Sequence, residues 1–164
     1  MYHKGDVLAF AIDSAPTGAA IVTGYTKEAD HSTHIWYDLV FTDYTAKQPV
    51  SVEQLKSRRL FGRKVATSLN SAGYSICLDI EAVRNDCLVD NAARFHLVGR
   101  LPLDTTRLDY GGHGACSNYD DLIQSFLWGQ ERRKLPPDHY NEFVSKLDKS
   151  RPDEYFAVAD FLLK

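Results

Sequence analysis

Two short apolar runs near the start of the chain decide how we expect it to fold. The first is GDVLAFAID at residues 5–13, and the second is GAAIVTGY at residues 18–25. Both are rich in residues that favour β-strands, and the SAPT link at residues 14–17 has the composition of a turn. We therefore predict a β-hairpin that begins a small barrel.

Segments that favour β-strands continue through the first hundred residues. The run HIWYDLVF at residues 34–41 predicts a strand, and further strands are expected at residues 60–66, 74–80 and 94–98. One face of the 34–41 strand carries Ile35, Tyr37, Leu39 and Phe41, and the other carries Trp36 and Val40. Because both faces are apolar, either both are covered or one is a binding surface. Ser51 and Gln54 form a capping-box pattern, which predicts a short helix within residues 49–58.

The hydrophobic periodicity becomes helical in the last third of the chain. Residues 104–116 are polar and rich in glycine, which is typical of a loop. Ser117 is the expected N-cap of a helix, a second helix is expected after Pro137, and a third from about Pro152. The expected apolar stripe of the first helix is Tyr119, Leu122, Ile123, Phe126 and Leu127, and that of the third is Tyr155, Phe156, Ala159, Leu162 and Leu163.

This order of elements predicts an α+β fold. We expect an SH3-like or small antiparallel β-barrel of about five or six strands over residues 1–103, followed by a three-helix subdomain over residues 104–164. The two parts should pack as one compact unit, since 164 residues can bury one sizeable core without disulfides.

Composition narrows the setting in which the chain works. The first residues lack the basic and apolar plan of a secretory signal, and no apolar run reaches the length of about 20 residues that spans a bilayer. Three cysteines, Cys77, Cys87 and Cys116, form no C-x-x-C pair and are expected to be reduced structural thiols. We expect a cytoplasmic protein that has no membrane segment and no cofactor.

The negative charge lies in the C-terminal third. Residues 1–100 carry eleven Lys and Arg against eleven Asp and Glu, whereas residues 101–164 carry eight against eleven. An acidic surface disfavours nucleic acid as the main partner and favours a partner with a basic surface.

Two alternative functions rest on small groups of residues. A nucleic-acid interface would use the basic segment that contains Arg58, Arg59, Arg63 and Lys64, with phosphate contacts and stacking. An enzyme would use Cys116 as nucleophile and His113 as base. Cys116 and His113 lack an orienting group and a second pair of metal ligands, and His31 and His34 lack a further ligand. The common glycine-rich phosphate motifs are absent from the sequence. No enzyme is therefore predicted.

The N-terminal pattern resembles a known family. Residues 4–10, the strand at 18–25 and the run at 36–41 look like the start of bacterial immunity proteins of the Imm26 type. The resemblance covers residues 4 to about 100 and implies a cytoplasmic binding protein that neutralises a cognate toxin in competition between bacteria, through contact-dependent or type VI secretion systems. It transfers no functional residue, because the match is to a strand pattern.

The predicted function is therefore occlusion of a cognate toxin, with the toxin domain as partner. Acidic residues of the last third would steer a basic, nuclease-type toxin, and a tryptophan outside the apolar stripes would anchor it. The candidate binding residues are Trp36, Trp128, Asp120, Asp121, Asp138, Glu142, Asp153 and Glu154.

Overall fold

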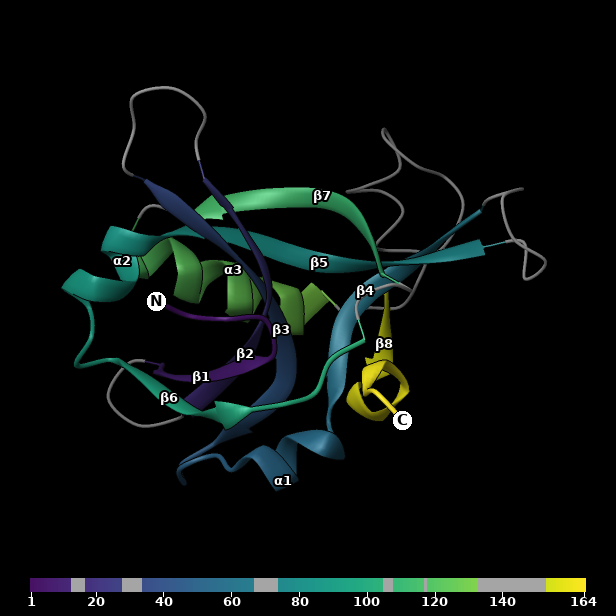
Figure 1. Cartoon of the computed structure of the whole chain (residues 1–164), viewed down its shortest axis with the longest axis horizontal. Coiled ribbons are helices and arrows are strands. Elements are labelled where there is room, and N and C mark those ends of the chain that lie inside the picture. The colour runs from purple at the N-terminus through teal and green to yellow at the C-terminus, as the bar shows by residue number, and fades with distance from the viewer. Residues whose placement is uncertain (13–16, 28–33, 67–73, 105–107, 117, 133–152) are drawn as a thin grey trace.

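The computed structural model describes residues 1–12, 17–27, 34–66, 74–104, 108–116, 118–132 and 153–164 (Figure 1). Its strands are β1 (Asp6–Ala11), β2 (Thr17–Lys27), β3 (Ile35–Ala46), β4 (Arg59–Ala66), β5 (Tyr74–Arg84), β6 (Phe95–Arg100), β7 (Leu108–Cys116) and β8 (Asp153–Ala157). Its helices are α1 (Val52–Lys56), α2 (Asn85–Asp90), α3 (Tyr119–Arg132) and the 3-10 helix η1 (Val158–Phe161). The predicted α+β class is confirmed.

The strands form one curled sheet. Their order is β6-β1-β2-β3-β4-β5-β7, with β8 added on β4 and a further pairing between β3 and β5. The described pairings are antiparallel except that of β5 with β7, which is parallel. The predicted opening hairpin is confirmed, and Phe10 of β1 lies opposite Gly18 of β2. A Cβ atom at residue 18 would lie 2.5 Å from the Phe10 ring, so glycine makes room for that ring.

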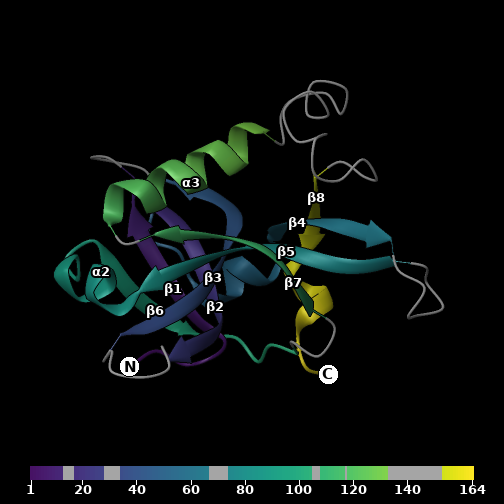
Figure 2. The ribbon, with the colours of Figure 1, turned by 90° about the horizontal axis from the view of Figure 1, so that it is seen from above.

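The first core lies between the sheet and α3. It contains Leu8 and Phe10 of β1, Phe41 of β3 and Phe126 of α3. The Phe126 ring meets those of Phe10 and Phe41 edge-on, with centroids 5.0 and 5.2 Å apart. Figure 2 shows α3 running across the curled strands β1 to β3. The helix therefore closes one face of the sheet.

The second core lies on the opposite face, because alternate strand residues such as Val7, Ala9 and Val40 point the other way. Short segments cover it: α1 contributes Leu55 and η1 contributes Phe161. The apolar faces predicted for residues 34–41 are thus both covered, Tyr37, Leu39 and Phe41 in the first core and Val40 in the second. The Ser51–Gln54 capping box of α1 is confirmed in both directions.

Two predictions for the last third are wrong. Residues 108–116, expected as a loop, form β7, because β5 offers a parallel partner that outweighs their glycine content. The third helix expected from about Pro152 is strand β8 followed by η1, because the exposed edge of β4 pairs with residues 153–157. Residues after 103 thus add two strands to the sheet, rather than helices alone.

The first C-terminal helix is confirmed as α3. Tyr119, Leu122, Ile123 and Phe126 of its predicted stripe are buried, whereas Leu127 is 39% exposed. The predicted N-cap Ser117 and the second helix expected after Pro137 lie outside the described residues. Asn118 caps the helix instead: its side-chain oxygen accepts a hydrogen bond from the Asp121 amide at 2.9 Å.

Candidate functional site

Three predicted binding residues meet on the outer face of α3. Asp120, Asp121 and Trp128 are all exposed there, and the Trp128 side chain is 52% accessible. Helical spacing places Gln124 and Leu127 on the same face, one and two turns after Asp120. The α3 face, defined as Asp120, Asp121, Gln124, Leu127 and Trp128, therefore combines carboxylates with a large aromatic group.

The first turn of α3 holds its carboxylates for a local reason. A helix N-terminus carries about half a positive charge, which favours Asp120 and Asp121 there. The Asp121 side chain also contacts the cap residue, since its carboxylate accepts a hydrogen bond from the side-chain amide of Asn118 at 2.6 Å. Within the part of the chain that the structure describes, the side chains of Asp120 and Gln124 make no hydrogen bond or ion pair.

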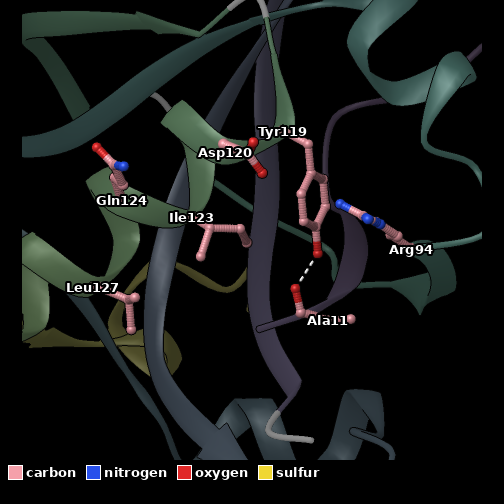
Figure 3. Close-up of a pocket in the computed structure, with 7 residues that line it drawn as sticks. All are labelled: Ala11, Arg94, Tyr119, Asp120, Ile123, Gln124 and Leu127. Atoms are coloured by element: carbon pink, nitrogen blue, oxygen red, sulfur yellow. Dashed lines mark hydrogen bonds between the residues drawn. The ribbon is translucent and has the colours of Figure 1, made fainter. Parts of the chain in front are cut away.

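A cavity of about 490 Å³ lies beside this face (Figure 3). Its lining comes from β1, the residue before β6, and α3: Ala11, Arg94, Tyr119, Asp120, Ile123, Gln124 and Leu127. In Figure 3, Arg94 and Gln124 lie at opposite ends of this group, with Asp120 and Ile123 between them. The cavity thus has a cation at one end, a neutral amide at the other, and the Asp120 carboxylate and the apolar Ile123 between them.

Tyr119 forms a fixed wall of the cavity. Its hydroxyl donates a hydrogen bond to the Ala11 carbonyl, and its ring packs edge-on against Phe95 with centroids 5.3 Å apart. The Arg94 guanidinium lies 4.6 Å from the centre of the same ring, within the range of a cation–π contact. Contacts with Ala11 of β1 and with Arg94 and Phe95 at the start of β6 therefore fix the position of the Tyr119 side chain.

The other described candidates, Trp36, Asp153 and Glu154, lie on strands rather than on α3. Trp36 is half-buried in β3, between Thr26 of β2 and Arg84 of β5. Asp153 and Glu154 belong to β8, and in the backbone register of the sheet they lie opposite Arg63 and Gly62 of β4. Asp138 and Glu142 lie outside the described residues.

Sequence reasoning identified only Asp120 of the seven lining residues as a site residue. The hydrophobic periodicity predicts Leu127 in the apolar stripe, although its spacing from Asp120 and Gln124 also places it on their side of the helix. Arg94 and Ala11 carry no local signal, because only the pairing of β1 with β6 brings them next to α3.

The geometry around Cys116 does not suit a nucleophile. The thiol is buried in the first core and donates a weak hydrogen bond to the Glu81 carboxylate at 3.5 Å. Burial, together with the negative charge of Glu81, raises the pKa of Cys116 to about 12, whereas an activated thiol needs a lowered pKa. His113 lies in the same strand, opposite Ile80 of β5.

The basic segment is partly engaged within the protein. The Arg59 guanidinium and backbone amide both bind the Asp43 carboxylate, at 2.8 and 2.9 Å. The Arg58 guanidinium lies 5.3 Å from the centre of the Tyr44 ring. Arg63 and Lys64 belong to β4.

Neither a metal site nor a membrane span is found among the described residues. No three His, Cys, Asp or Glu side chains there gather closely enough to hold a metal ion. In the same part of the chain, no helix is long and apolar enough to cross a membrane. Comparison with family models, curated proteins and solved structures gives no match.

Proposed function

We propose that this chain is an immunity protein that binds a cognate bacterial toxin through the α3 face and blocks the toxin's active site. In this proposal it acts in the cytoplasm of the producing cell, its curled sheet is an SH3-like barrel, and it serves competition between bacteria by contact-dependent or type VI secretion. The resemblance of residues 4 to about 100 to Imm26 proteins and the character of the α3 face support it.

One observation supports the proposal most. Asp120, Asp121 and Trp128 were selected from the sequence for different reasons, and they lie together on one exposed helix face. Protein interfaces commonly combine a central aromatic anchor with charged residues around it. A rigid helix that rests on the first core also presents these side chains with little conformational cost.

The charge of this face favours a basic partner. The active sites of nucleases that act on nucleic acid are positively charged, because their substrate is a polyanion. Carboxylates on an inhibitor mimic that charge and speed the encounter of the two proteins, by about one to three orders of magnitude at low salt. A nuclease-type toxin is thus the partner that this surface suits.

The test is direct binding and inhibition. The purified chain is mixed with the toxin domain encoded beside it, and complex formation is measured by calorimetry while toxin activity is assayed in parallel. We expect a one-to-one complex of submicromolar Kd that abolishes activity. Absence of a complex at micromolar concentrations would refute the proposed function.

A further inference from the structure

We propose that the cavity beside α3 receives a basic side chain of the partner, with the Asp120 carboxylate as its counter-ion. This inference rests on the proposed function and specifies the group that the α3 face recognises. It is carried by the lining of the cavity, whose members come from three separate parts of the chain.

Two polar side chains of the cavity wall make no hydrogen bond or ion pair with another described residue. The Asp120 carboxylate and the Gln124 amide line the cavity one helical turn apart, and within the described residues neither is hydrogen-bonded or ion-paired. A protein that covers this cavity removes water from the carboxylate, which is costly unless a cation replaces that water. A guanidinium or ammonium group satisfies the Asp120 carboxylate and the Gln124 side-chain oxygen together.

The apolar part of the wall suits the stem of such a side chain. Ile123 and Leu127 line the cavity beside Asp120 and Gln124. Lysine and arginine place their methylene groups along apolar surface while the charged end reaches a polar partner. A volume of about 490 Å³ admits one long side chain together with some water.

The charges around the cavity predict how two substitutions should change the affinity for a basic group. Two carboxylates in the first turn of α3 outweigh the half positive charge of the helix N-terminus. The Arg94 cation is held over Tyr119 at the other end of the cavity and would repel a second cation. Neutralising Asp120 and neutralising Arg94 should therefore change the affinity for a basic group in opposite directions.

The experiment compares three variants of the full chain in binding to the toxin domain. Asp121→Asn is the matched control for Asp120→Asn, because both remove one exposed charge from the same turn but only Asp120 lines the cavity. We expect Asp120→Asn to raise Kd about tenfold or more, mainly by faster dissociation, and Asp121→Asn to slow association only. Arg94→Gln, which keeps most of the side-chain stem, should lower Kd.

Two results would overturn the inference while the toxin still binds. Equal effects of Asp120→Asn and Asp121→Asn would mean that the carboxylates act only at long range. Weaker binding by Arg94→Gln together with unchanged or tighter binding by Asp120→Asn would mean that the cavity receives an acidic group.

A separate probe decides the question if no toxin complex forms, in which case the proposed function itself has failed. N-acetylarginine amide is titrated into the labelled protein and compared with N-acetylnorleucine amide, which has an apolar side chain without the charge. Shifts of the Ile123 and Leu127 methyl resonances with the arginine compound alone, abolished in Asp120→Asn, support a site for a basic side chain. No shifts, or equal shifts with both compounds, overturn it.

Discussion

The two faces of the sheet are covered in different ways. The face that α3 covers is closed by one long helix, whose Phe126 ring meets Phe10 and Phe41. The opposite face is closed by short pieces: α1, residues 101–103, β8 and η1. The single helix presents the exposed α3 face, whereas the short pieces are joined to one another by backbone hydrogen bonds. Hydrogen bonds join Asp104 to Phe161 and Leu163 to Pro102, for example.

The largest expected effect is loss of stability when the first core loses a ring. Phe126 is fully buried and also stacks near Phe61, with centroids 6.3 Å apart, so Phe126→Ala should lower the free energy of unfolding by about 3–5 kcal/mol. Urea denaturation measures this change. Phe161→Ala in the second core is the comparison. It should cost less, because η1 is a 3-10 helix of only four residues and can detach locally without unfolding the sheet. An equal cost would mean that both covers are integral to the cooperative unit.

A second, smaller effect tests how tightly each face is packed. A Cβ atom at residue 18 would press on the Phe10 ring, which is fully buried among other rings, whereas one at residue 62 would lie 2.8 Å from the Cys77 carbonyl oxygen and 3.0 Å from the Phe156 ring. Overpacking of this kind costs about 1–3 kcal/mol. We expect Gly18→Ala to lose more stability in urea than Gly62→Ala, because its Cβ atom comes closer, to 2.5 Å, and the Phe10 ring that it meets is enclosed by other aromatic rings. The reverse order would contradict the contrast between the faces.

Elements with a strong local pattern were the ones that could be predicted. The opening hairpin, the strand at 34–41, α1 and α3 each carry their own periodicity or cap, and the structure contains all of them. Strand β7 contains Gly111, Gly112 and Gly114, and β8 follows Pro152, so their local sequence favours other conformations until β5 and β4 supply partners. The site divides in the same way. Asp120 and Trp128 follow from helical spacing, whereas Arg94 depends on a tertiary contact with Tyr119.

A third prediction concerns function on the α3 face. If Trp128 anchors the toxin, Trp128→Ala should speed dissociation by about thirtyfold, which corresponds to the roughly 2 kcal/mol of an interface hot spot. Its free energy of unfolding should fall by much less than that of Phe126→Ala, because about half of the Trp128 side chain is exposed. Trp36→Ala is the control on the sheet, and surface plasmon resonance gives the rates. Faster dissociation of Trp36→Ala alone would move the binding surface to the start of β3.

The smallest expected effect is the reactivity of the two thiols of the first core, Cys87 and Cys116. Burial is the main cause that raises the pKa of Cys87 to about 11 and that of Cys116 to about 12, from an ordinary value of 9.0. At neutral pH both thiols should therefore be alkylated far more slowly than free cysteine, and they should react at the rate of free cysteine only after unfolding in urea.

The raised pKa values of the two thiols also make the stability of the protein depend on pH. The folded state favours the protonated thiols more than the unfolded state does. The resulting contribution to the free energy of unfolding is fully present below pH 9 and is lost as the pH rises towards 11 and 12. Urea midpoints at pH 8 and pH 10.5 measure that loss, with Cys87→Ala and Cys116→Ala reducing it. Rapid labelling of folded Cys116 at neutral pH would contradict the burial of this thiol and would restore the nucleophile hypothesis for Cys116 and His113.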